Sequence, residues 1–192
     1  MTSMKKAFAI LTLAGALFCS SCDDPYEIPW LSLYPLYQSD DILVDRLAGT
    51  WYSTGDESER IVFTVYGNSY YIADENLKDG EWIETLHAGA FLLRLGDTFF
   101  LDFSASPELS VRGHLFLKIQ FDRDELQISA LDDGWLRQQV AEQSALSYLD
   151  IPGGAMVIAA PTRELRSFLL KHAHDPDAFD SSVTARLHRR SQ

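Results

Sequence analysis

The sequence predicts a mainly β domain in which an antiparallel meander forms a barrel or a strongly bent sheet, with two helices near the C-terminus. Three observations predict it. Apolar and polar residues alternate with a period of two between residues 49 and 131, and short polar turns separate the alternating runs. The last third changes to the spacing of helices. Strands with one apolar and one polar face are typical of antiparallel sheets.

One strand face is expected to carry the large apolar side chains. In residues 115–122 every odd-numbered position is apolar, and segments 61–65, 91–95 and 99–103 follow the same pattern. If the sheet closes with space inside, six of these side chains would line an apolar pocket: Phe63, Phe91, Phe99, Phe103, Leu117 and Phe121. A filled core is the alternative, because small barrels are often packed solid.

Short loops set the register of each hairpin, because residues paired across a hairpin must face the same side. Three such loops are expected, at residues 66–69, 96–98 and 122–125. The loop 96–98 would pair Leu95 with Phe99, and Gly96 can supply the positive φ that a tight turn needs.

The last third of the chain contains the helical segments. Residues 133–148 are expected to form one helix, which Asp133 can cap, and Thr162 is expected to cap a second. Residues 156–160 and the alternating residues 183–187 predict two further strands. The pair Asp132 and Asp133 could also form an acidic site, but a turn and helix cap is the favoured interpretation.

The N-terminus has the three-part pattern of an export signal. Lys5 and Lys6 precede an apolar run, residues 7–18, which is too short to span a bilayer and is followed by small residues and two cysteines. This segment resembles a bacterial lipoprotein signal, and Cys22 fits the lipidated position better than Cys19. We therefore expect a signal peptide at residues 1–21, the lipidated Cys22 with a tether up to residue 45, and a single domain at residues 46–192.

The tether, residues 23–45, combines prolines with aromatic residues. The prolines oppose regular structure, whereas exposed aromatic side chains often anchor interfaces. Two interpretations remain open: the tether packs against its own domain, or it docks onto a partner.

Gly49, Thr50 and Trp51 open the first strand of the meander. A Gly-x-Trp at this place resembles the opening motif of the lipocalin and fatty-acid-binding superfamily. The resemblance implies an eight-stranded barrel whose base is closed by Trp51, and it implies an internal ligand. Residues 162–179 also resemble the tail of uncharacterised bacterial lipoproteins with a lipocalin-like domain, for which no activity is implied.

Charge and motifs exclude several classes of function. The chain has 28 acidic and 16 basic residues, so a nucleic-acid partner is not expected. No nucleophile elbow, nucleotide-binding loop or Cys-x-x-Cys pair is present. His172 and His174 are spaced poorly for a shared metal ion, and His87 and His114 are expected to be exposed strand residues. We expect neither a cofactor nor a metal.

Two functions fit the sequence. The first is a non-enzymatic protein anchored by lipid in the bacterial cell envelope, at the inner or outer membrane, that binds an apolar small molecule or a protein partner. The alternative is a solid structural or assembly subunit of an envelope complex that docks through its aromatic tether.

Overall fold

The computed structural model describes residues 30–104, 113–143, 146–150, 156–179 and 185–189. Its centre is a closed antiparallel barrel, as the alternation predicted, and this architecture is consistent with a lipocalin-like fold. In order around the barrel, the eight strands are β2 (Gly49–Ser53), β3 (Asp56–Tyr66), β4 (Ser69–Lys78), β5 (Glu81–Leu95), β6 (Thr98–Ser104), β7 (His114–Asp122), β8 (Glu125–Ala130) and β11 (Ala185–His188). Pairing of β6 with β7 and of β11 with β2 completes the ring.

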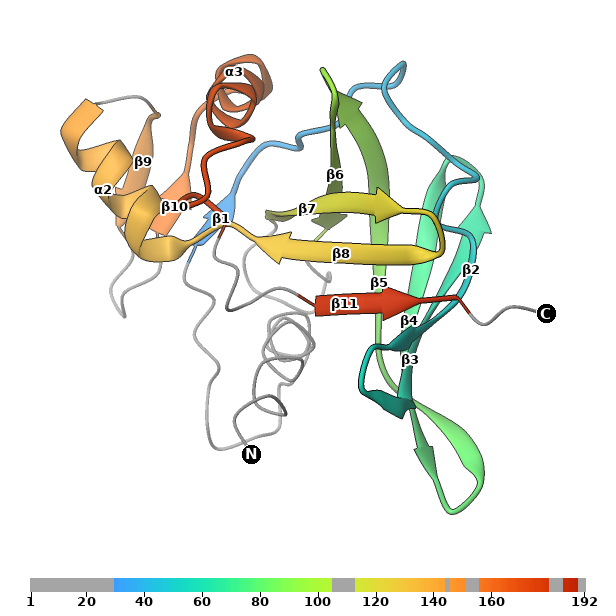
Figure 1. Ribbon diagram of the computed structural model, residues 1–192. Helices are drawn as coiled ribbons and strands as arrows, with labels where there is room; N and C mark the ends of the chain where they lie inside the picture. The colour runs from blue at the N-terminus through green and yellow to red at the C-terminus, as the bar shows by residue number, and fades with distance from the viewer. Residues whose placement is uncertain (1–29, 105–112, 144–145, 151–155, 180–184, 190–192) are drawn as a thin grey trace.

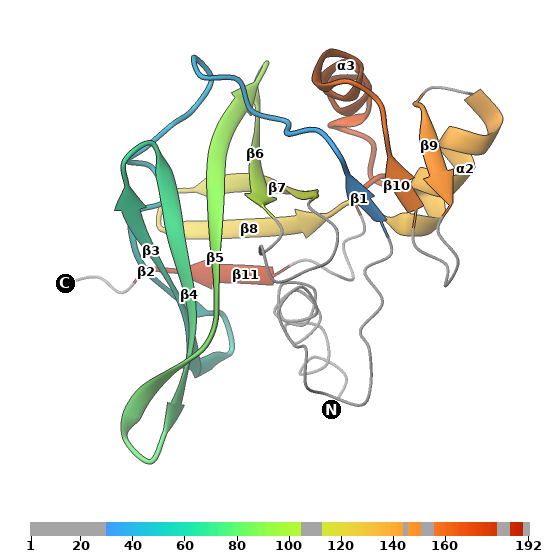
Figure 2. The ribbon, with the colours of Figure 1, turned by 180° about the vertical axis from the view of Figure 1, so that it is seen from behind.

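Three short strands extend the sheet away from the barrel. They are β1 (Trp30–Ser32), β9 (Tyr148–Asp150) and β10 (Met156–Ile158). β1 meets β7 and runs parallel to β10, which pairs in turn with β9. Figures 1 and 2 show that this extension and the helices α2 (Asp133–Gln143) and α3 (Thr162–His172) gather on one side of the barrel. None of the described helices has the length and apolar character to cross a membrane.

One end of the barrel is closed by the segment that precedes β2. The indole Nε1 of Trp51 donates a hydrogen bond to the carbonyl of Leu47 (2.8 Å), and the Leu47 amide donates to the hydroxyl of Tyr70 (3.2 Å). Arg189, which directly follows β11, stacks over the Trp51 ring and donates to the Ala48 carbonyl. The first and last strands of the barrel are therefore fastened together where the barrel closes.

The hairpin between β5 and β6 differs from the prediction by one residue. Leu95 pairs with Thr98 and not with Phe99, so the turn contains only Gly96, at φ 60°, and Asp97. A shift of one residue reverses the faces of a strand. The side chains of Leu93 and Leu95 therefore lie on the outside of the barrel, and the predicted inward direction is wrong.

The outer face of β5, β6 and β7 is apolar because α3 and the residues after it cover it. Leu93 and Phe100 are fully buried although both lie on this outer face. The Phe100 ring lies 6.1 Å from that of Phe179, and the Lys118 ammonium donates to the Ala173 carbonyl at the end of α3. These strands therefore carry apolar side chains on both faces, because the barrel interior buries one face and the outer layer buries the other.

The helix boundaries also differ from the prediction. α2 ends at Gln143, and Tyr148, expected in that helix, belongs to β9. The Asp132 carboxylate accepts a hydrogen bond from the Trp135 amide (2.6 Å), which confirms the turn and cap interpretation of the Asp132–Asp133 pair but makes Asp132 the capping residue. β11 covers residues 185–188, whereas residues 183–184 of the predicted last strand lie outside the described ranges.

Thr162 does not cap α3. It is the first residue of the helix and follows Pro161, and its hydroxyl donates to the Pro35 carbonyl (2.7 Å) in the tether. Arg166 of the same helix forms an ion pair with Asp41, and this pair lowers the pKa of the Asp41 carboxyl. These contacts hold the tether against α3.

We expect Trp51→Phe to lower the free energy of unfolding by about 1–3 kcal/mol, because it removes the bond to Leu47 and part of the buried ring. Urea denaturation measures the change. Trp82→Phe is the matched control, since Trp82 is half-buried on the outer face, where Arg60 stacks on it. It should cost less than about 1 kcal/mol. Equal losses would contradict the role of Trp51 in closing the barrel.

Candidate ligand-binding site

Large side chains fill the inside of the barrel at its closed end. Phe99 and Phe121 meet edge to face with ring centroids 5.3 Å apart, and the Arg46 guanidinium lies 4.4 and 4.5 Å from their centroids. Phe63 packs in the same way against Tyr70, at 6.1 Å. These contacts resemble a solid core, so space for a ligand would have to lie nearer the other end.

Five of the six side chains predicted to line a pocket share the inner face: Phe63, Phe99, Phe103, Leu117 and Phe121. Phe91 does not, because the register of β5 and β6 pairs it with Asp102 on the outer face. There its ring stacks on Tyr37 with centroids 4.1 Å apart. Its assignment to the inner face is wrong, whereas pocket lining by the other five stays a prediction.

Toward the opposite end, the inner face carries several short side chains beside the larger Phe103 and Leu115. Ala88 pairs with Ile72, and Ala130 pairs with Leu117. Ala185 on β11 and Ser53 at the end of β2 also lie on this face. An eight-stranded barrel is just wide enough to be filled by its side chains or to hold one small ligand. Alanine and serine leave more of that width unfilled than the phenylalanines at the closed end.

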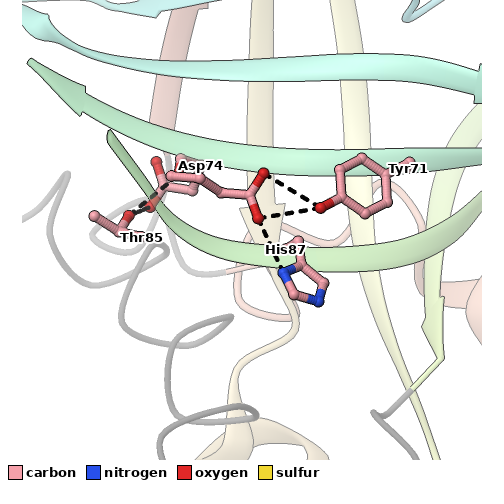
Figure 3. Close-up of polar contacts among 5 residues, drawn as sticks. Tyr71, Asp74, Thr85 and His87 are labelled. Atoms are coloured by element: carbon pink, nitrogen blue, oxygen red, sulfur yellow. Dashed lines mark hydrogen bonds and ion pairs between the residues drawn. The ribbon is translucent and has the colours of Figure 1, made fainter. Parts of the chain in front are cut away.

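Asp74 is a carboxylate on the inner face near this wider end. It pairs with Ile61, which pairs with Trp51, so the three side chains face the same side. Asp74 is 8% exposed, and its Oδ2 accepts a hydrogen bond from the Thr85 hydroxyl (3.2 Å; Figure 3). Among the described residues its buried Oδ1 has no hydrogen-bond partner, although the backbone amide of the neighbouring Glu75 also acts on this carboxyl and lowers its pKa. The bulge between β4 and β5 at Asp74 brings Thr85 to this position.

The electrostatic surroundings of Asp74 are acidic. Burial raises the pKa of Asp74 to about 6, and the charges of Glu59 and Glu75 add to the rise, whereas hydrogen bonds from the Thr85 hydroxyl and the Glu75 backbone amide oppose it. Glu59 lies on the same inner face, opposite Asn76, and its own pKa is raised by burial and by Asp56. This end of the barrel therefore concentrates negative charge, which together with burial raises the pKa of Asp74 to about 6.

A second polar cluster lies outside the barrel, on the other face of β4 and β5. The Tyr71 hydroxyl donates to the Glu84 carboxylate, and the Nδ1 of His87 lies 3.0 Å from the same carboxylate (Figure 3). The side chains of Glu84 and His87 are 42% and 63% exposed, so water competes for these contacts. We assign this cluster to the surface of the hairpin.

A buried acid and a partly buried histidine, which the sequence did not reveal, lie beneath the tether. Asp102 is fully buried, its Oδ1 lies 2.7 Å from the Nδ1 of His114, and its Oδ2 accepts a hydrogen bond from the Leu36 amide (2.7 Å). The expectation that His114 is exposed is therefore wrong. The alternation of apolar and polar residues correctly placed His114 on the outer face, but no nearby residue in the sequence indicated that the tether covers that face. The pair fastens the tether to the barrel.

His172 and His174 lie in different surroundings. The His172 ring packs between Trp135 and Phe168, each with its centroid 4.9 Å away, and burial lowers the pKa of His172. The side chain of His174 is exposed and lies 3.2 Å from Asp97. The two side chains do not meet at a common site.

Parts of the tether pack on its own domain. Trp30 is 3% exposed and lies against Phe116, and Tyr37 stacks on Phe91. Tyr34 is exposed. Cys22 and the predicted signal lie outside the described residues.

Comparisons with known proteins found no relative of this chain. The chain matched no protein-family model, no curated protein and no solved structure.

We expect Asp74→Asn to stabilise the protein near pH 7.5 by about 1–3 kcal/mol. The pKa of Asp74 in the folded protein, about 6, exceeds its ordinary value of 3.8, so the folded state binds the proton more tightly. Its contribution to the free energy of unfolding therefore falls as the pH rises from about 4 to about 6, and the asparagine removes this loss.

Urea denaturation at about pH 7.5 and about pH 4.5 measures the effect, which should shrink at the lower pH. Asp79→Asn, in the exposed turn of the same hairpin at φ 53°, makes the same charge change as a control. A destabilised Asp74→Asn protein at both pH values would show that the carboxylate supports the fold.

Proposed function

We propose that this protein is a lipid-anchored protein of the bacterial cell envelope that binds a small, largely apolar molecule inside its barrel, without catalysing a reaction. The buried, unpaired Oδ1 of Asp74 on the inner face carries this proposal. Burial of a polar atom without a hydrogen-bond partner costs free energy, and native proteins rarely contain such an atom. A bound molecule would supply the missing partner.

The contrast between the two ends of the barrel supports the same function. Rings and the Arg46 guanidinium fill the closed end, whereas the opposite end has alanine and serine on its inner face beside Phe103 and Leu115. The short side chains are the place where the barrel could admit a ligand. The apolar inner positions would contact the body of the ligand.

The docking alternative receives less support. Trp30 and Tyr37 are engaged by the domain itself, through Phe116 and Phe91, and are not free to insert into a partner. Tether aromatics that pack inward stabilise their own fold. We therefore favour the ligand-binding barrel.

Ligand binding can be tested with N-phenyl-1-naphthylamine, an uncharged apolar dye whose fluorescence rises in apolar surroundings. Ala88→Leu adds volume to the inner face, and we expect it to weaken dye binding at least about tenfold. Gly89→Leu is the matched control, because its neighbouring position faces outward into open space. Absence of dye binding by the unmodified protein would refute the function, and equal binding by both variants would exclude the barrel interior.

Membrane attachment is tested by Cys22→Ala. If a lipid on this cysteine anchors the chain, the variant should leave the membrane fraction, since the two later helices are not membrane-spanning and the attached acyl chains supply the membrane affinity. Cys19→Ala should remain in the membrane fraction. A Cys22→Ala protein that stays there would refute the anchor.

A further inference from the structure

We infer that the ligand carries a protonated amine on its apolar body and that Asp74 binds this amine. The inference rests on the proposed ligand-binding function and names the chemical class of the ligand. It is carried by the position of Asp74, by the unpaired state of one of its oxygens, and by the charges that surround it.

The geometry supplies one free acceptor on the inner face, with apolar residues on one side of it and the acidic Glu59 on the other. Thr85 engages Oδ2 of Asp74, while Oδ1 is buried without a partner. The neighbouring inner positions are Ile61, Ile72 and Ala88. An ionised carboxylate can only accept hydrogen bonds, so its partner must be a donor. A molecule with one donor group on an apolar body matches this wall.

The surrounding charges favour a cationic donor over a neutral one. Glu59 lies on the same face toward the wider end, and within the described residues no lysine or arginine pairs with Asp74 or Glu59. The nearest arginine of the adjoining strand, Arg60, faces outward and pairs with Glu75. A charge-assisted hydrogen bond is about twice as strong as a neutral one. A ligand carboxylate would instead meet charges of its own sign.

The same arrangement makes amine binding dependent on pH. The titratable groups that act on Asp74 are Glu59 on β3 and Glu75 beside it on β4, while β5 contributes the Thr85 hydroxyl. His87 and Glu84 of β5 lie in the outer cluster with Tyr71. Protonation of Asp74 removes the charge that attracts the amine, so affinity should fall as the pH drops through about 6.

The experiment compares decylamine, decanol and decanoate, which share one alkyl chain, as competitors of the bound dye. At about pH 7.5 we expect decylamine to bind about tenfold more tightly than decanol, and decanoate to bind most weakly. Asp74→Asn should reduce the affinity for decylamine about tenfold and leave that for decanol nearly unchanged. Asp79→Asn should change neither affinity. Decylamine binding by the unmodified protein should weaken between about pH 7.5 and about pH 5.

Different results overturn different claims. If the dye binds but decanol or decanoate competes as well as decylamine, or Asp74→Asn has no effect, the amine assignment is wrong and the ligand-binding barrel stands. If the dye itself does not bind the unmodified protein, the proposed function fails and the amine assignment fails with it. Calcium chloride alone serves as a further control, and displacement of decylamine by calcium would identify a metal-ion site in place of an amine site.

Discussion

Closure of the barrel depends on the contacts between the segment before β2 and the residue after β11. Leu47 binds both Trp51 and Tyr70, and Arg189 covers the Trp51 ring while it binds the Ala48 carbonyl. These contacts join the two ends of the barrel sequence. Because the first and last strands are held in register here, the remaining hairpins can form a continuous wall with one closed end.

A second layer outside the barrel determines which side chains can be apolar. The tether covers β5 and the ends of β6 and β7, and the residues at and after the end of α3 contact β6 and β7. Strands under this layer are buried on both faces, so they accept Leu93 and Phe100 on the outside as well as Leu92 and Leu101 on the inside. On β3 and β4 the outer face mixes the polar Arg60 and Glu75 with the apolar Val62 and Ala73.

The sequence predicted the barrel because alternation and short turns are local signals. The pairings of Val65 with Tyr70 and of Phe121 with Leu126 were confirmed. The error at Leu95 arose where both strand faces are apolar, because alternation then no longer distinguishes a two-residue turn from a three-residue turn. The partial burial of His114 depends on the tether, which is distant in sequence. The hydrogen bond from Thr85 to Asp74 depends on a bulge. Neither feature leaves a local pattern in the sequence.

The parallel pairing of β1 with β10 has a consequence for how the molecule assembles. Trp30, near the start of the described chain, is matched with Met156, near its end. During synthesis from the N-terminus, β1 has no strand neighbour until β7 has emerged and no parallel partner until β10 follows, and joining such remote segments carries an entropic cost of ring closure. The earliest strand should accordingly be among the last to dock, and until then its hydrophobic residues are open to chaperones and proteases.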